Sequence, residues 1–229
     1  MKNNLSHAEI ETLSTISKGR HRTNLFKNYE QRTLAFLVRH LPSWMSSNKL
    51  TFIGFIGSLI TMLSFILAKY VQREYLLIGV LGFAINWFGD SLDGRFAYYS
   101  KHPRKWYGFA LDITIDWITT ILIGIGYVVY TDDVWELLGF GFVVMYGWAM
   151  ITILLKYKIT DKYTIDTGLF GPTEARIIIS LILVLEVLFK DSIIYSAVFA
   201  CVFLFIVDII DTLNLLHLAN EKDIAERAK

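Results

Sequence analysis

The chain alternates six long apolar stretches with short polar segments. The apolar stretches lie at about residues 50–69, 75–98, 107–130, 134–155, 173–189 and 192–218. A helix needs about 20 mainly apolar residues to cross the hydrocarbon core of a bilayer, and each stretch is of about that length. The pattern therefore predicts an all-α integral membrane protein with six transmembrane helices, in which residues 50–229 form one membrane domain.

Residues 1–49 form an N-terminal segment of a different kind. Within it, residues 25–41 carry apolar side chains such as Phe36 on one side and basic ones such as Arg32 elsewhere. This pattern predicts an amphipathic helix that lies in the membrane interface and ends at Pro42. A solvated helix packed on another subunit is the alternative. The segment lacks an apolar core followed by a small-residue cleavage site, so it does not have the pattern of a secretory signal peptide.

The composition agrees with a membrane protein. Of the 229 residues 54% are hydrophobic and 15% aromatic, and the mean hydropathy of +0.46 is too high for an ordinary soluble domain. The formal net charge of +1 gives no reason to expect a nucleic-acid partner. Cys201 is the single cysteine, so an intrachain disulfide framework is excluded.

Four aspartates lie inside or beside the second and third apolar stretches. At about 100° per residue, Asp90 and Asp93 fall within about 60° of one another on one helix. Asp112 and Asp116 form a second stripe on the next helix, and residues 100–105 between them predict a short turn. The two acidic stripes are therefore expected to face each other across an antiparallel helix pair.

Such a cluster needs a compensating charge, because each carboxylate at membrane depth costs about 2.5–3.5 kcal/mol. A divalent cation would offset that cost. Neither stripe contains His or Cys, and oxygen-only ligands suit Mg²⁺, Mn²⁺ or Ca²⁺ rather than Zn²⁺. Gly94 and Gly108 lie on the same faces and would let a ligand approach the backbone closely. Carboxylates, cations and bare backbone together are typical of a site for a diphosphate ester.

Three alternative roles for the aspartates fit the sequence less well. A purely structural cluster would need a buried cation, and the basic residues nearest in sequence lie at helix ends. They are Arg95, Lys101, Arg104 and Lys105. A cation transporter would place its acids at the midplane of broken, repeated helices. An intramembrane prenyltransferase also binds a diphosphate, and Asn86 four residues before Asp90 is a faint echo of one, but six spans are too few and the second acidic pair has the wrong spacing.

The acidic motif resembles the signature of the CDP-alcohol phosphotransferases, also called CDP-alcohol phosphatidyltransferases. That signature reads Asp-x-x-Asp-Gly-x-x-Ala-Arg, then about eight or nine residues, then Gly-x-x-x-Asp-x-x-x-Asp. Seven of its eight fixed positions are present here: Asp90, Asp93, Gly94, Ala97, Gly108, Asp112 and Asp116. The eighth, an arginine, is replaced by Tyr98.

The resemblance implies an enzyme of phospholipid biosynthesis, a metal-dependent transferase. It would move a substituted phosphate from a CDP-linked donor, usually CDP-diacylglycerol, to an alcohol acceptor and release CMP. Members of the family often form homodimers. A small polar alcohol is the expected acceptor.

The resemblance also implies roles for individual residues. Two Mg²⁺ or Mn²⁺ ions would be held by four ligands, which are Asp90, Asp93, Asp112 and Asp116. Asp116 would in addition take the proton from the acceptor hydroxyl. Room for the nucleotide would come from Gly94, Ala97 and Gly108, with Thr51 and Arg95 as further contacts.

Tyr98 is the departure from the family pattern, because it offers one hydroxyl and no charge where a guanidinium is expected. Lys101, Arg104 or Lys105 in the following turn would supply the missing charge near the substrate. The alternative is that catalysis has been lost and the chain is a nucleotide-binding membrane protein. Arg176 opens a later apolar stretch and is the expected contact of the acceptor, although a snorkelling anchor is an equal alternative.

Basic residues are unevenly distributed between the two sides of a six-span chain. One side carries 19 of the 22 Lys and Arg residues, in segments 1–49, 95–105, 156–176 and the C-terminal tail. Cytoplasmic loops of membrane proteins carry such an excess. The count predicts that both termini and the acidic cluster face the cytoplasm, where a water-soluble nucleotide is available.

Overall fold

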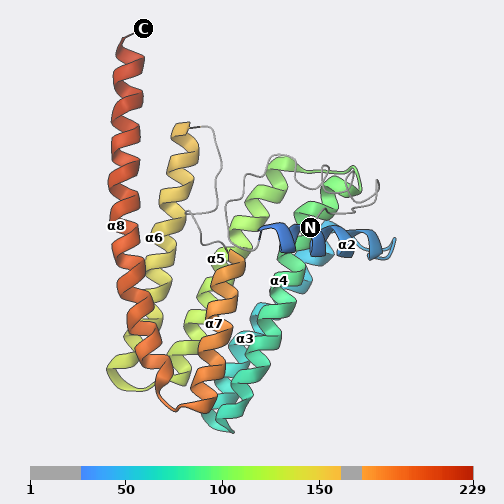
Figure 1. Ribbon diagram of the computed structural model, residues 1–229, viewed down its shortest axis with the longest axis vertical. Coiled ribbons are helices and arrows are strands. Elements are labelled where there is room, and N and C mark those ends of the chain that lie inside the picture. Colours follow the sequence, from blue (N-terminus) through green and yellow to red (C-terminus); the bar gives the residue numbers. More distant parts are fainter. Residues whose placement is uncertain (1–26, 161–171, 229) are drawn as a thin grey trace, which may run out of the picture.

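The computed structural model describes residues 27–160 and 172–228, and every regular element in that part of the chain is helical. The α-helices are α2 (Lys27–His40), α3 (Ser47–Tyr70), α4 (Leu76–Tyr99), α5 (Lys105–Tyr130), α6 (Glu136–Thr160), α7 (Pro172–Leu188) and α8 (Ser192–Arg227). Short 3-10 turns precede α4 and α6, at Arg73–Tyr75 and Asp133–Trp135. The long helices run roughly parallel to one another, and α8 extends beyond the others at its C-terminal end (Figure 1).

Five helices are long and apolar enough to cross a membrane by length and composition. They are Ser47–Tyr70, Arg73–Tyr99, Lys105–Tyr130, Asp133–Thr160 and Ser192–Arg227. These match five of the six predicted spans. The remaining predicted span, 173–189, corresponds to α7, which is apolar but has only 17 residues. The helical membrane character of the chain is thus confirmed, whereas a sixth crossing stays a prediction.

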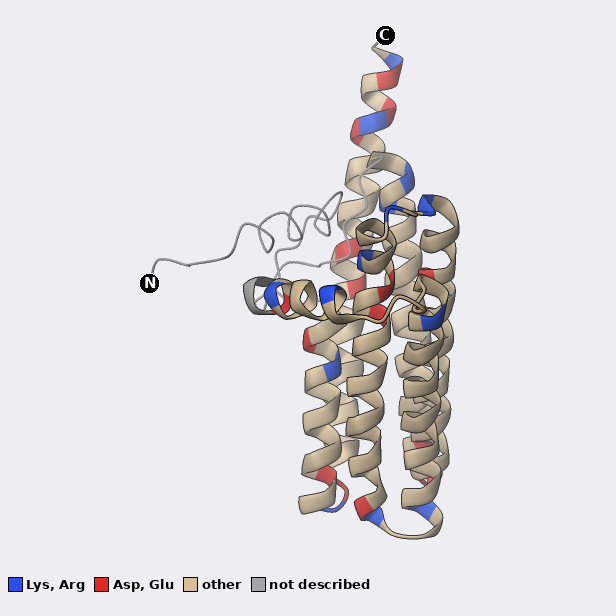
Figure 2. Cartoon of the chain, turned by 90° about the vertical axis from the view of Figure 1, so that its right-hand side faces the viewer, with Lys and Arg blue, Asp and Glu red and all other residues tan. Residues whose placement is uncertain are grey.

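The outer surface of the helices is apolar along most of its length. Charged residues lie mainly toward the two ends of the bundle, with a mainly uncharged band between them (Figure 2). Large apolar side chains are exposed on the outer faces of several helices, for example Leu63, Leu81, Phe140, Leu181 and Phe199. Soluble monomers rarely expose so much contiguous apolar surface, whereas lipid covers it in a membrane.

Helix α2 runs across the end of the bundle rather than along it (Figures 1 and 2). Its buried residues Leu34 and Val38 pack against Leu50 of α3 and Leu92 of α4. This orientation is the one that an interfacial helix needs, but its location in the interface stays a prediction. The rest of the predicted N-terminal segment, residues 1–26, lies outside the described residues.

Helix α3 packs closely against α4 along a line of small residues. Ser58 and Thr61 of α3 are fully buried, and both hydroxyls bond to backbone carbonyls of their own helix. Gly54 of α3 and Gly89 of α4 bring the two backbones together, because a Cβ on Gly89 would overlap the backbone nitrogen of Gly54. Small residues allow such close approach between helices in membranes. The contact fixes the height of α4 relative to α3, and with it the position of the residues that follow Gly89.

A buried carboxylate joins α7 to α8 at the opposite end of the bundle. Glu186 of α7 is 1% exposed and accepts hydrogen bonds from the backbone N–H groups of Asp191 (3.1 Å) and Ile193 (2.9 Å). The Tyr130 hydroxyl of α5 donates a third bond to it at 2.8 Å. The carboxylate therefore satisfies free N–H groups at the start of α8, where the helix dipole also favours a negative charge.

We predict that Gly89→Ala destabilises the fold. The added methyl group would meet the backbone of both Leu50 and Gly54, which cannot move aside as a flexible side chain would. Overpacking of this kind costs roughly 1–3 kcal/mol of unfolding free energy. Thermal unfolding of the detergent-solubilised protein, followed by circular dichroism, measures the loss.

Gly141→Ala is the matched control, because its added carbon would meet only the Cys201 sulfur at an ordinary distance of 3.7 Å. Equal melting temperatures for Gly89→Ala and the wild type would contradict the close α3–α4 contact.

Candidate functional site

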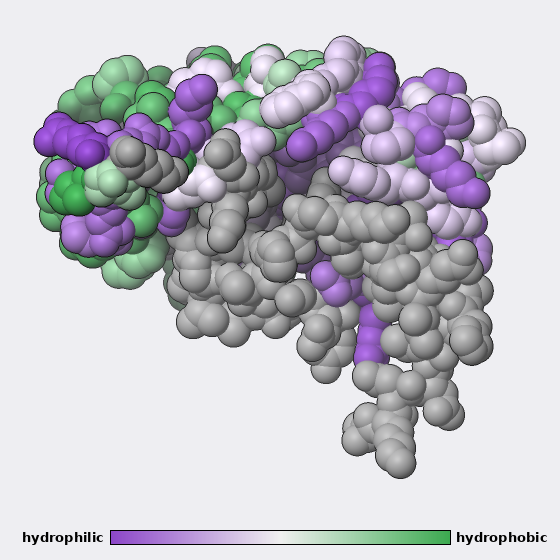
Figure 3. All heavy atoms as spheres, turned by 90° about the horizontal axis from the view of Figure 1, so that it is seen from above, coloured by the Kyte–Doolittle hydropathy of each residue, from purple (hydrophilic) through white to green (hydrophobic). Residues whose placement is uncertain are grey.

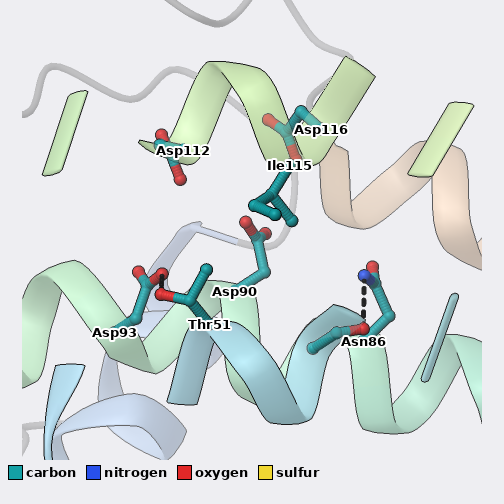
Figure 4. A pocket seen from close by; sticks show the side chains of 8 residues that line it. Thr51, Asn86, Asp90, Asp93, Asp112, Ile115 and Asp116 are labelled. Carbon is teal, nitrogen blue, oxygen red and sulfur yellow. Dashed lines mark hydrogen bonds between the residues drawn. The ribbon is translucent and has the colours of Figure 1, made fainter. Parts of the chain in front are cut away.

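Helices α4 and α5 bring three carboxylates together. Asp90 of α4 and Asp112 and Asp116 of α5 each place one carboxylate oxygen within 4.8 Å of the other two (Figure 4). All three are half-buried. Helix α4 ends at Tyr99 and α5 begins at Lys105, so the predicted turn between the two acidic helices is present. The two acidic stripes approach each other as the helical periodicity predicts.

Helix α3 closes one side of the space between the two acidic helices. Helices α4 and α5 both pack on α3, and the pocket lies between them. Its lining residues are Thr51, Gly54, Asn86, Asp90, Asp93, Asp112, Ile115 and Asp116. These residues belong to the first half of α3 and of α5 and to the middle and second half of α4. Helices α3 and α5 begin, and α4 ends, toward the same end of the bundle (Figure 1). Seen from that end, the molecule presents many hydrophilic side chains, and apolar ones show mainly along an outer edge (Figure 3).

Asp93 lines the same pocket but is held differently from the other three aspartates. It is 8% exposed, and its carboxylate accepts a hydrogen bond of 2.6 Å from the Thr51 hydroxyl of α3 (Figure 4). The backbone N–H of Gly94 also donates to it. Thr51, which the sequence suggests as a nucleotide contact, therefore orients Asp93 in this structure.

Arg176 reaches the acidic cluster from the first turns of α7. Its guanidinium lies 2.8 Å from an oxygen of Asp90 and 4.0 Å from one of Asp116. The expectation that no basic residue lies among the acids is therefore wrong, because it considered only residues near the motif in sequence. One guanidinium carries a single positive charge, so it can offset only one of the two carboxylates when both are ionised. Glu174 and Thr173, beside Arg176 in sequence, are buried at the same end.

Arg95, a suggested nucleotide contact, lies away from the pocket. Its side chain is buried and forms an ion pair of 3.6 Å with Glu30 of α2. It also donates to the backbone carbonyl of Ser91. The structure therefore places Arg95 between α4 and α2, where it holds the N-terminal helix, rather than among the residues that line the pocket.

The other suggested contacts surround the open side of the site. Gly94, Ala97 and Tyr98 continue α4 and are half-buried. A Cβ on Gly108 of α5 would have no neighbour within 4 Å, so the space there is open.

The turn between α4 and α5 carries three exposed basic side chains: Lys101, Arg104 and Lys105. Arg104 donates to Asn48 at the start of α3 and lies 4.0 Å from the centre of the Tyr107 ring. Lys101 has a positive φ of 61°, which marks the tight turn that follows α4. Arg104 is thus held toward α3, and the approach of these three side chains to a substrate stays a prediction.

Two residues near the cluster were not assigned to it from the sequence. Asn86 lies one helical turn before Asp90 and lines the pocket. That spacing was its signal, because residues four apart share a helix face. Tyr146 of α6 interacts electrostatically with Asp116 and Arg176. No sequence pattern links α6 to the motif, so only the packed structure reveals Tyr146.

The donor atoms of the pocket suit a hard divalent cation. Every polar side chain that lines the pocket carries oxygen, and Asn86 carries an amide nitrogen as well. No His or Cys is among the lining residues. Oxygen donors select Mg²⁺, Mn²⁺ or Ca²⁺ over Zn²⁺ or Cu²⁺. The three grouped carboxylates therefore fit the predicted metal, although they do not by themselves choose between Mg²⁺ and Mn²⁺.

Comparison with known proteins adds no further constraint. The chain matches no protein-family model. No curated protein matches its sequence. The function proposed below therefore rests on the residues of the site and on the motif that they form.

We predict that Arg176→Gln tightens Mn²⁺ binding. The guanidinium occupies an oxygen of Asp90 that a cation would also use, so the two positive charges compete. A hydrogen bond to a charged group is worth about 1.5–3 kcal/mol, so the dissociation constant for Mn²⁺ should fall about tenfold or more. Electron paramagnetic resonance of free Mn²⁺ in detergent solution measures it.

Arg104→Gln is the control, because Arg104 belongs to the same end of the molecule but bonds to Asn48. Unchanged or weaker Mn²⁺ binding by Arg176→Gln, with the fold intact, would show that the arginine does not compete with the metal.

Proposed function

We propose that the protein is a metal-dependent CDP-alcohol phosphotransferase of phospholipid synthesis. It transfers a substituted phosphate, phosphatidyl when the donor is CDP-diacylglycerol, to a small polar alcohol and releases CMP. The observation that carries this proposal is the meeting of Asp90, Asp112 and Asp116 at one end of an apolar helical bundle. These residues belong to a motif that has seven of the eight fixed positions of that family.

The proposal includes an orientation in the membrane. Counting α7 as a sixth span, the α4–α5 turn, the start of α7 and the end of α8 all face the cytoplasm. This arrangement is supported by their position at one end of the molecule (Figure 1) and by the excess of Lys and Arg in the corresponding segments. The nucleotide then reaches the site from water, while a lipid donor reaches it from the bilayer.

Asp90, Asp93, Asp112 and Asp116 would hold two Mg²⁺ or Mn²⁺ ions. When bound, such ions neutralise charge on a diphosphate and stabilise the leaving group. Thr51 keeps Asp93 in place through the 2.6 Å hydrogen bond. The resemblance to the family implies that three small residues make room for the nucleotide: Gly94, Ala97 and Gly108.

Asp116 would act as the general base. Its carboxylate takes the proton of the acceptor hydroxyl, while the hydroxyl oxygen forms a bond to the phosphorus atom that carries the lipid. The bond from that phosphorus to the bridging oxygen breaks, and CMP leaves with this oxygen. Arg176 lies 4.0 Å from Asp116. Beside an acceptor bound there it would orient the hydroxyl or an acidic group on the acceptor.

The direct test is CMP release from purified protein in detergent. Labelled CDP-diacylglycerol with Mg²⁺ or Mn²⁺ should yield CMP only when an alcohol from a panel of polar acceptors is present. Excess chelator should abolish the release, because the aspartates would then lose their cations. Release that is independent of metal and acceptor, or no release with any CDP-linked donor, would contradict the proposal.

Two aspartate variants serve as internal controls in that assay. Asp112→Asn should abolish turnover and weaken nucleotide binding together, since it removes a metal ligand. Asp116→Asn should abolish turnover but retain more of the nucleotide binding, since the base acts on the acceptor. Full activity in Asp112→Asn would exclude the assigned metal site.

Tyr98 gives a separate prediction about the position where this chain departs from the family. If basic residues of the α4–α5 turn supply the charge, Tyr98→Phe should lower kcat/KM by no more than about tenfold, since a neutral hydrogen bond is worth about 0.5–1.5 kcal/mol. Arg104→Gln or Lys105→Gln should lower kcat/KM by a larger factor than Tyr98→Phe does, because hydrogen bonds from a charged donor are stronger.

Tyr98→Arg distinguishes the enzyme from a binding protein on the same scaffold. Restoring the family residue should not raise activity. An inert wild type that becomes active through Tyr98→Arg would show that the natural chain binds the nucleotide without turning it over.

A further inference from the structure

Basic and aromatic side chains gather where α3 and α5 begin. Two segments contribute them, residues 41–49 and 99–109, and neither contains Asp or Glu. Arg104 donates a hydrogen bond to Asn48, which joins the two segments. We call the exposed members of this group the basic–aromatic patch: Trp44, Lys49, Lys101, Arg104, Lys105, Trp106 and Tyr107.

Two lysines of the patch are each held beside a tryptophan. The Lys49 ammonium lies 5.0 Å from the centre of the Trp44 ring and donates to the Trp44 backbone carbonyl at 2.9 Å. The Lys105 ammonium lies 5.0 Å from the centre of the Trp106 ring. Both distances are within the limit of about 6 Å for a cation–π contact. These contacts keep the two charges close to large apolar rings instead of extended into water.

Within residues 27–160 and 172–228, none of the four basic side chains of the patch forms an ion pair with Asp or Glu. The arginines that do form such pairs lie elsewhere, Arg95 with Glu30 and Arg176 with Asp90. Four like charges on two adjoining short segments repel one another. An anionic partner would relieve that repulsion, so the patch is complementary to negative charge.

The patch is positioned at the depth of the lipid headgroups, because α3 and α5 are long and apolar enough to cross a membrane and the patch surrounds their first residues. Trp44 and Trp106, next to these helix starts, are 65% and 68% exposed. Tryptophan is enriched at the membrane–water interface. Phe52, about one turn along α3 from Lys49, is 61% exposed and would contact the acyl chains below the headgroups.

We propose that the basic–aromatic patch binds the headgroups of anionic phospholipids, in the leaflet on the side of the acidic site. Lys49, Arg104 and Lys105 contact the phosphate groups, and the two tryptophans lie at the interface beside them. Basic residues beside membrane helices attract anionic lipids by about 1 kcal/mol each, which is about fivefold in affinity. A zwitterionic lipid has no net charge and gains less. Neither the metal site nor a CDP-linked donor takes part in this binding, so it goes beyond the proposed function.

Native mass spectrometry of the purified protein in detergent tests the proposal. Phosphatidylglycerol and phosphatidylcholine with the same acyl chains are titrated in the presence of a chelator, and the apparent dissociation constant of each is measured. Phosphatidylglycerol should bind at least about fivefold more tightly. Lys49→Gln should raise its dissociation constant about fivefold, and the double variant Lys49→Gln/Lys105→Gln should raise it further by a similar factor. Lys49→Arg keeps the charge and should bind as tightly as the wild type.

Lys190→Gln is the matched control, because Lys190 is an exposed lysine between α7 and α8 at the opposite end of the bundle. This variant should leave the affinity for phosphatidylglycerol unchanged. Glycerol phosphate, the soluble form of the headgroup, should not displace the lipid at an equal concentration. Displacement would show that the patch binds phosphate esters from water, which would overturn the proposal.

Three further results would overturn the proposal. They are equal affinity of the wild type for the two lipids, an undiminished preference for phosphatidylglycerol in Lys49→Gln/Lys105→Gln, and a loss in Lys190→Gln as large as that in Lys49→Gln. The measurement is independent of turnover, since it contains neither metal nor CDP-linked donor. A protein that releases no CMP still shows the lipid preference if the patch binds as proposed, and an active enzyme without the preference loses the role of the patch alone.

Discussion

The electrostatic cost of placing carboxylates among apolar helices is the constraint on which the site depends. Asp90, Asp112 and Asp116 lie within 4.8 Å of one another, so their mutual repulsion adds to the cost of removing each from water. Within the described residues, Arg176 provides a guanidinium for two of them. A cluster of this kind needs its charge offset further, by a proton retained on one carboxyl group or by the cation of the proposed site.

The close packing of α3 against α4 turns that cluster into a defined site. Gly54 and Gly89 bring the two backbones together, and the same contact places the Thr51 hydroxyl at 2.6 Å from Asp93. It also places the Gly54 carbonyl within hydrogen-bond distance of Asn86. Helix α3 carries none of the acidic residues, yet it orients side chains on both sides of Asp90. A change in this helix contact is therefore expected to alter the site without touching a carboxylate.

The sequence predicts the helices and the acidic motif well, for a physical reason. Both are local, because hydrophobic length identifies a span and helical periodicity places Asp112 and Asp116 on one face. The one predicted span that stays undecided is also a matter of local length. At 17 residues, α7 is near the minimum for a crossing, so composition alone does not decide it.

Contacts between distant segments could not be predicted in the same way. Arg176 follows the motif by 60 residues and meets Asp90 only through the packing of α7 on α4. The burial of Arg95 against Glu30 depends on the docking of α2, which periodicity does not reveal. Asn86 has the right spacing to Asp90, but its hydrogen bonds to Gly54 and Ser58 depend on the packing of α4 on α3.

The position of a metal ion in crystals of the protein grown with Mn²⁺, located by anomalous scattering, tests most directly whether these aspartates form a metal site. A metal site here predicts an anomalous peak between α4 and α5, within about 2.0–2.6 Å of oxygens from Asp90, Asp112 and Asp116, the range for hard cations. It also predicts that Arg176 moves away from Asp90. Crystals with no peak at this position, in which Arg176 still pairs with Asp90, would contradict the assignment of these aspartates as metal ligands.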